Sequence, residues 1–322
     1  MKSGFDTLRA VFRAVTEEGA SSRSEITKKT GISQVSVSKA VRELLDSELI
    51  SSSGSISTGG RLSEFLCPSY TRKYLVINLC EKPFSYAVVH LGEKLTSHGL
   101  ASPSVSYVNY LNDLDFCENV IILARRISQE LIQPPIAVAI ALPSTGSDTD
   151  EHRSCNEFYD HLGDDPCAIF KSFGIHTDIV ADRMTALTEC SELRHAALPS
   201  VYVSFSHKVY GVYRNGINHD FDWSDTRIDG VSVSDILKCY QSGERLTQKL
   251  TKFLNVCADI FHAKSILIDT NMISEDTVGD ICDSSNIITD VTDSAPILSG
   301  LLSLLADRQI KELPSSHFNS KK

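Results

Sequence analysis

The stretch SRSEITKKTGISQVSVSKAVRELLDSELI, residues 22–50, decides the fold of the first part of the chain. Ser22 and Glu25 have the spacing of a capping box, in which the serine accepts from the amide of Glu25 and the glutamate returns to the serine's own amide. This pattern predicts a short helix that ends at Gly31. Ser33 follows after a tight turn and is a good N-cap for a second helix.

Beyond Ser33, apolar residues recur at the spacing of one helix face. Further upstream, residues 5–15 show the same periodicity and predict a preceding helix. Three helices with a tight turn between the last two are typical of a helix-turn-helix, and a solvated face in an unrelated three-helix bundle is the alternative. The residues predicted to face the core are Phe5, Leu8, Val11, Phe12 and Val15 in the first helix, Ile26 in the second, and Val37, Ala40, Val41, Leu44 and Leu45 in the third.

A recognition helix uses its amino end for base edges and its later cations for phosphates. The glycine- and serine-rich segment 51–61 directly follows this helix and predicts a wing hairpin, with a flexible linker as the alternative. Two glycines before Arg61 permit close backbone approach, so Arg61 can enter a minor groove or hold a phosphate. The predicted DNA-contacting residues are Gln34, Ser36 and Ser38 near bases, Ser33, Lys39 and Arg42 at phosphates, and Arg61 in the wing.

The length of 322 residues and the 42% share of hydrophobic residues predict a globular chain of about two domains. The net charge of -10 argues against binding nucleic acid by bulk electrostatics, but the charge is unevenly distributed. Residues 1–72 carry ten Lys or Arg and eight Asp or Glu, whereas the rest carries 21 and 33. We therefore expect a small DNA-binding domain over 1–72, an acidic body over 73–313 and a disordered tail over 314–322.

The nine cysteines include no C-x-x-C pair, which fits neither a disulfide framework nor a common zinc module. No apolar run approaches the roughly 20 residues of a membrane helix, and the amino terminus lacks the apolar core of a signal peptide. The ten histidines are dispersed. We therefore expect a cytoplasmic protein with reduced thiols, no metal, no cofactor and no membrane partner.

The body has an α/β pattern that occurs twice. Strands are expected at 73–79, 84–90 and 94–100, then a helix near 111–131 and a buried strand at 136–142. The second set comprises strands at 201–205, 209–214 and 217–221, helices near 233–240 and 244–263, and a strand at 265–269, with Asn215-Gly216 as a hairpin turn. Such a duplication suggests the two-lobed fold of the actin-like and hexokinase-like ATPases.

The segment 22–50, the Gly59-Gly60-Arg61 wing and the YLVIN strand at 74–78 together resemble the ROK family (repressor, open reading frame, kinase), in its transcriptional-repressor branch. The resemblance covers nearly the whole chain and is strongest over residues 20–62. It implies a winged helix-turn-helix fused to a sugar-kinase-like body that senses carbohydrate. It also implies assembly into dimers or tetramers.

Kinase members of that family carry glycine-rich phosphate loops, because phosphates need closely approaching backbone amides. The corresponding segment 78–84 here has no glycine and contains Pro83, while the segments at 204–211 and 269–271 have lost most or all of their expected glycines. The family's zinc motif is absent as well, since His219 is followed by no cysteine before Cys239. These departures predict a protein that is not an enzyme.

Asp182 aligns with the aspartate that, in the family, holds a sugar hydroxyl and serves as the kinase's base. It can equally act as the N-cap of the predicted helix 184–194. The loop 144–147 follows a buried strand and could contact an effector.

The sequence thus predicts a DNA-binding transcriptional repressor that binds a palindromic duplex operator as a homodimer or homotetramer and responds to a carbohydrate. Two alternatives stay open. One is a sugar kinase with an appended DNA-binding domain, and the other is a regulator whose body only dimerises or binds a protein partner.

Overall fold

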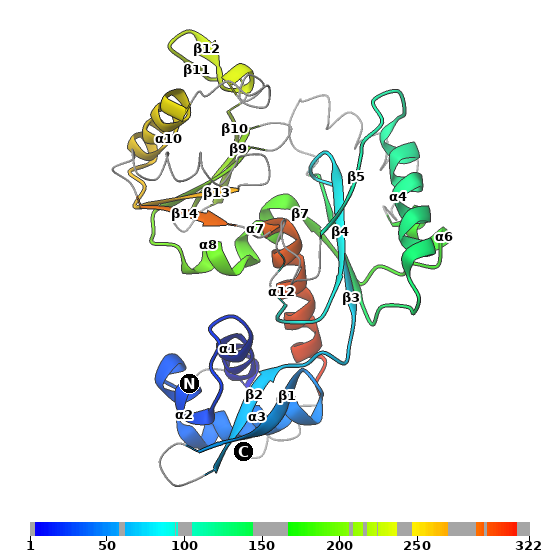
Figure 1. Cartoon of the computed structure of the whole chain (residues 1–322), viewed down its shortest axis with the longest axis vertical. Helices are drawn as coiled ribbons and strands as arrows, with labels where there is room; N and C mark the ends of the chain where they lie inside the picture. Colours follow the sequence, from blue (N-terminus) through cyan, green and yellow to red (C-terminus); the bar gives the residue numbers. More distant parts are fainter. Residues whose placement is uncertain are drawn as a thin grey trace.

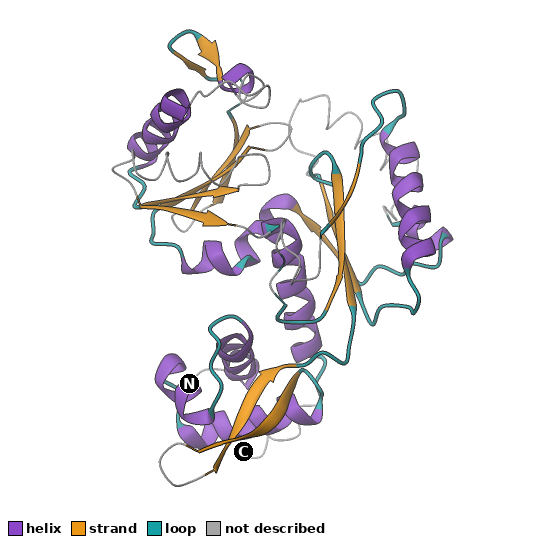
Figure 2. Ribbon diagram, in the orientation of Figure 1, coloured by secondary structure: helices purple, strands orange, loops and turns teal. Residues whose placement is uncertain are grey.

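The computed structural model describes residues 4–57, 62–93, 95, 105–143, 167–205, 209–214, 218–223, 225–236, 247–269, 288–292 and 295–313. A small helical unit at the amino end, here called the head, lies below two α/β lobes that form the body (Figure 1). Each lobe is built on one sheet with helices beside it (Figure 2). None of the helices in these ranges is long and apolar enough to cross a membrane.

The head consists of three helices and one antiparallel hairpin. Its helices bury the predicted apolar faces, although Phe5 and Leu45 are only partly buried. The hairpin strands pair from Ile50 with Pro68 to Ser57 with Leu62. The elements are α1 (Gly4–Thr16), α2 (Arg23–Thr30), α3 (Gln34–Asp46), β1 (Ile50–Ser57) and β2 (Leu62–Pro68).

Local hydrogen bonds explain where α2 begins and ends. Ser22 accepts from the amide of Glu25 at 3.3 Å, as expected. The Glu25 carboxylate accepts from the amide and the hydroxyl of Ser21, one residue earlier than predicted, at 2.8 and 2.9 Å. The bond from the Ser21 amide lowers the pKa of Glu25. Gly31 ends the helix with φ 66°, a left-handed conformation that glycine adopts without strain.

The two lobes of the body share one strand order, which confirms the expected duplication. In each sheet the first three strands pair antiparallel, and the last two run parallel to the third. The strand orders are β5-β4-β3-β6-β7 and β10-β9-β8-β13-β14. The first sheet comprises β3 (Tyr74–Asn78), β4 (Phe84–Val89), β5 (Ser106–Val108), β6 (Val138–Leu142) and β7 (Ile179–Asp182). The second comprises β8 (Ser200–Phe205), β9 (Val209–Arg214), β10 (Asn218–Asp222), β13 (Ser265–Asp269) and β14 (Ile288–Thr292).

Helices cover both faces of the first sheet, and alternate residues of β3 show this. Leu75 and Ile77 pack in the cluster formed with α4 and α6, whereas Tyr74 and Val76 belong to the cluster that includes α12. The second sheet packs on α10. The helices are α4 (Phe116–Glu130), α6 (Ala168–Ser172), α7 (Arg183–Glu189), α8 (Ser191–His195), α10 (Thr247–Phe261) and α12 (Pro296–Lys311), and a short hairpin is formed by β11 (Arg227–Ile228) and β12 (Val231–Ser232).

Some expected elements differ from those observed. The helix predicted over 184–194 is broken at Cys190, whose backbone is extended (ψ 135°), and forms α7 and α8 instead. The strand β5 occurs at 106–108, and most of the segment predicted as a strand at 94–100 lies outside the described residues. The turn at 215–216, the wing residue Arg61, the loop at 144–147 and the tail 314–322 lie outside them too.

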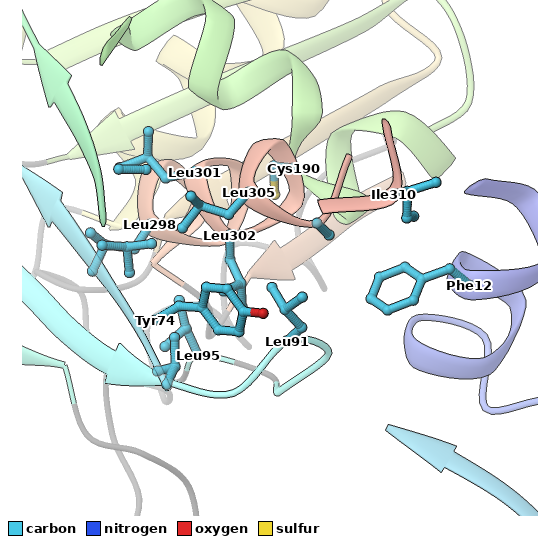
Figure 3. Close-up of a cluster of buried hydrophobic side chains, with 14 of the residues drawn as sticks. Phe12, Tyr74, Leu91, Leu95, Cys190, Leu298, Leu301, Leu302, Leu305 and Ile310 are labelled. Atoms are coloured by element: carbon cyan, nitrogen blue, oxygen red, sulfur yellow. The ribbon is translucent and has the colours of Figure 1, made fainter. Parts of the chain in front are cut away.

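Helix α12 packs against both the head and the first lobe of the body. Its leucines pack on Tyr74 and Leu91, and at its far end Ile310 belongs to the same buried cluster as Phe12 of α1 (Figure 3). A close crossing with α7 fixes its other side, because a Cβ added to Gly300 would lie 1.7 Å from the carbonyl oxygen of Ala186. The hydrophobic core is therefore continuous from the head into the first lobe.

Candidate nucleic-acid interface

The amino half of α3 presents an exposed face. Gln34, Val35, Lys39 and Arg42 are exposed, and Ser38 is half-buried. Positions 35, 39 and 42 are spaced as i, i+4 and i+7, so their side chains follow one stripe along the helix. Most of the residues predicted to contact DNA thus lie together on one helix.

Two of the predicted contacts also serve the helix itself. The Ser33 hydroxyl accepts from the amide of Ser36 at 3.3 Å and donates to the Ser36 hydroxyl at 3.0 Å. These bonds satisfy one of the free amides at the start of α3. Ser33 therefore fixes where the exposed face begins.

The cations of the head fall into two groups. Arg23 pairs with Glu64 at 2.6 Å, Lys29 with Glu18 at 3.9 Å, and Arg72 with Glu48 at 3.5 Å. In contrast, Lys28 of α2 and Lys39 and Arg42 of α3 form no ion pair with any residue in the described part of the chain. The exposed face of α3 therefore carries two cations without an ion-pair partner among the described residues.

The hairpin leads from α3 toward the predicted wing. Gly54, with φ 65°, lies at a register shift between Ser52 and Ser55. The base of the hairpin is held to the helices, because the amide of Leu66 donates to the carbonyl of Ser21 at 2.8 Å. The hairpin is thus anchored beside α2, while its tip at 58–61 lies outside the described residues.

Val35 was not among the residues predicted to contact DNA, yet 69% of its surface is exposed on the same stripe as Lys39 and Arg42. The prediction selected polar residues only. The signal that could have found Val35 is its spacing, since an apolar residue four positions before Lys39 and seven before Arg42 cannot face the core.

A network of arginines and carboxylates holds α1 against the body. One oxygen of Glu189, Oε2, lies 2.8 Å from Arg9, 3.0 Å from Arg13 and 3.2 Å from Arg194. Arg9 also makes a two-pronged contact with Asp307, at 2.8 Å to Oδ1 and 2.5 Å to Oδ2. The two arginines of the head thus bind carboxylates of α7 and α12.

Burial shapes the electrostatics of this network. It lowers the pKa of the Arg13 guanidinium, and the nearby charge of Arg194 adds to this effect. Burial also raises the pKa of Asp307, although Arg13 and Arg9 oppose the rise. An open pocket of about 310 Å³ lies beside the network, between α1, the end of α2 and α8. The seam between head and body is therefore charged and partly accessible to solvent.

In the body, polar side chains gather at the carboxyl ends of strands from both lobes. Asn78 at the end of β3 donates to Glu81 at 3.2 Å, and Ser204 at the end of β8 donates to the other oxygen of Glu81 at 3.5 Å. Asp182 ends β7 and caps α7, accepting from the amide of Thr185 at 2.7 Å. Carboxyl ends of strands are where α/β sheets bind ligands. Asn78, Glu81 and Ser204 were not predicted as site residues.

No three His, Cys, Asp or Glu residues among those described come together as a metal site. The segment between Asn78 and Phe84 is also poorly suited to hold phosphates. Its Cys80 amide already donates to Asn78 at 2.9 Å, and Pro83 has no amide to offer.

The two lobes of identical strand order give the body the α/β arrangement expected for an actin-like ATPase fold, and the body carries a helical head. Among solved structures, a ROK-family transcriptional regulator, a homologue of the E. coli MLC protein, matches with a TM-score of 0.52 and 14% identity, covering 95% of this chain and 97% of that one. The chain therefore has the fold of a ROK-family regulator over nearly its whole length.

Two further solved structures match about three quarters of the chain. They are an inorganic polyphosphate/ATP-glucomannokinase from Arthrobacter sp. strain KM (TM-score 0.48, 13% identity, 75% of this chain and 99% of that one) and a ROK family protein from Streptococcus pneumoniae TIGR4 in complex with sucrose (TM-score 0.41, 10% identity, 74% and 99%). The neighbour with a TM-score of 0.52 is thus a ROK-family protein, in agreement with the resemblance found in the sequence. No family model and no curated protein matches the sequence.

Proposed function

We propose that the chain is a transcriptional repressor whose head, residues 1–72, is a winged helix-turn-helix that binds duplex DNA. The observation that carries this proposal is the exposed face of α3, where Lys39 and Arg42 have no carboxylate partner among the described residues. Cations without partners attract phosphates and release counterions on binding. The whole-chain likeness to a ROK-family transcriptional regulator supports the same function.

The body, residues 73–313, is proposed to supply oligomerisation and the response to a carbohydrate. A homodimer or homotetramer presents two or more heads to a palindromic operator, which multiplies the few phosphate contacts that each head can make. The polar groups of Asn78, Glu81 and Asp182, together with the loop 144–147, are proposed to contact the effector. The protein acts on DNA in the cytoplasm.

Phosphoryl transfer is not part of this proposal. A kinase needs several backbone amides directed at the phosphates. In the segment after β3, the Cys80 amide is already bonded within the chain and Pro83 has none. Micromolar binding of ATP by titration calorimetry would support the kinase alternative instead.

The test begins with a duplex selected from a random-sequence pool by the full-length protein. Its affinity is then measured between 50 and 200 mM salt, about the range over which phosphate contacts dominate. Lys39→Gln and Arg42→Gln should each weaken binding and lower the magnitude of the salt slope by about 0.9 per subunit, because each removes one phosphate contact. Lys171→Gln, which removes the same charge from an exposed position on α6, is the matched control.

The proposal predicts that the control keeps the slope of the original protein. Failure to select any duplex, or an unchanged slope in both α3 variants, contradicts it.

A further inference from the structure

The feature that leads beyond the proposed function is the apolar side chain of Val35. It is 69% exposed at the second position of α3. In the described parts of residues 4–72, the only other large hydrophobic residue with this degree of exposure is Tyr70, which packs edge-on against His90. Val35 is therefore an apolar surface group at the amino end of a polar face.

The fold gives no reason for a valine at this position. Val35 belongs to none of the buried clusters, unlike Val37 and Val41 of the same helix. A β-branched side chain at an exposed helix position also stabilises the helix less than alanine does. Neither the core nor the helix itself thus requires Val35.

The position of Val35 fits the interior of a major groove. With a rise of 1.5 Å per residue, Lys39 and Arg42 lie about 6 and 10 Å further along the helix axis. The major groove is about 12 Å wide. The amino-terminal residues of a recognition helix contact base edges, so Val35 is directed toward the bases when Lys39 and Arg42, further along the helix, approach phosphates.

We propose that Val35 contacts the C5-methyl group of a thymine, and that the operator carries a thymine at this position in each half-site. The inference rests on the proposed function. The thymine methyl is the one apolar group that the four bases present in the major groove, and small apolar side chains recognise it by contact. Val35 is then a specificity-determining residue, while Lys39 and Arg42 hold the helix in place.

The experiment replaces each thymine of the selected duplex by uracil, which removes only the methyl group. Burial of one methyl-sized group changes affinity about fourfold. We expect one thymine position in each half-site at which uracil weakens binding by about this factor. In Val35→Ser the same replacement should have almost no effect, because the methyl has lost its apolar partner. Ile132→Ala, which removes an exposed apolar side chain of the body, is the matched control and should keep the fourfold effect.

The outcomes separate the two proposals. If no duplex is selected, both the proposed function and the role of Val35 are wrong. If a duplex is bound through Lys39 and Arg42 but no uracil weakens it, the thymine contact is wrong and the function stands. The same conclusion follows if the uracil effect persists in Val35→Ser.

Discussion

The carboxylate of Glu189 is the hub of the contact between head and body, and Glu189→Gln tests its contribution. The substitution keeps the size of the side chain and one carbonyl oxygen, but removes the negative charge. In the structure, Oε2 of Glu189 lies between 2.8 and 3.2 Å from guanidinium nitrogens of Arg9, Arg13 and Arg194. Among the described residues, the variant leaves these three cations with the carboxylates of Glu17 and Asp307 as ion-pair partners.

The expected cost follows from burial and from the number of bonds. The side chain of Glu189 is 26% exposed and those of its partners are between 13% and 28% exposed. Exposed ion pairs contribute about 0.2–1 kcal/mol, and hydrogen bonds to charged groups about 1.5–3 kcal/mol. Because the network is partly buried and glutamine retains some hydrogen bonding, we expect the free energy of unfolding to fall by about 2 kcal/mol.

Urea denaturation followed by circular dichroism measures this loss. A double-mutant cycle with Arg13→Gln should give a coupling energy of about 1 kcal/mol, since the two side chains are in direct contact. Glu312→Gln is the matched control. It removes the same charge from a pair with Arg308 at 2.9 Å whose side chains are 55% and 40% exposed, so its cost should stay below about 0.5 kcal/mol.

Raising the salt concentration should reduce the cost of Glu189→Gln only partly, because charges away from bulk water are screened less. The reasoning is refuted if Glu189→Gln costs no more than Glu312→Gln, or if Glu189 and Arg13 show no coupling.

Further predictions concern Gly300, two cysteines and Asp182. Gly300→Ala should lower the free energy of unfolding, measured by urea denaturation, by about 3 kcal/mol, because the new Cβ meets the backbone of α7. Ser299→Ala is the control and should change it little. Equal effects of the two substitutions would contradict the close crossing of α12 and α7. Burial raises the pKa of the Cys257 thiol to about 12, so its contribution to stability is present below about pH 9 and is lost as the pH rises through about 12. In the folded protein at pH 8, mass spectrometry after maleimide treatment should therefore find Cys67 modified before Cys257. Asp182→Ala should lower the free energy of unfolding by about 1 kcal/mol, because α7 loses its N-cap. If a sugar raises the melting temperature of the original protein but not that of Asp182→Ala, the result supports an effector role for Asp182.

Elements defined by local pattern were predicted well from the sequence. Ser22, Gly31 and Ser33 set the limits of α2 and α3 because their hydrogen bonds involve residues at most four positions away. Helix α12 was not predicted. Its buried residues include Ile297, Leu298, Leu301 and Leu302, so several faces are covered and the helix lacks the single apolar stripe that marks a surface helix.

The candidate site was predicted in part, for a related reason. The polar residues of α3 follow from helical spacing, but Val35 was missed because its side chain is apolar and only its exposure shows that it is outside the core. Asp182 was left with two possible roles. The structure shows its bond to the amide of Thr185, and the sugar role stays a prediction.

The sequence by itself determined the helices of the head, the polar face of α3 and the loss of glycines after Asn78, because each depends on neighbours within a few positions. Only the tertiary structure decided which cations are free. Arg9 and Arg13 bind carboxylates up to 298 positions away, whereas Lys39 and Arg42 have no such partner among the described residues. A charge attracts whatever the fold brings near it, and distance along the chain does not limit that attraction.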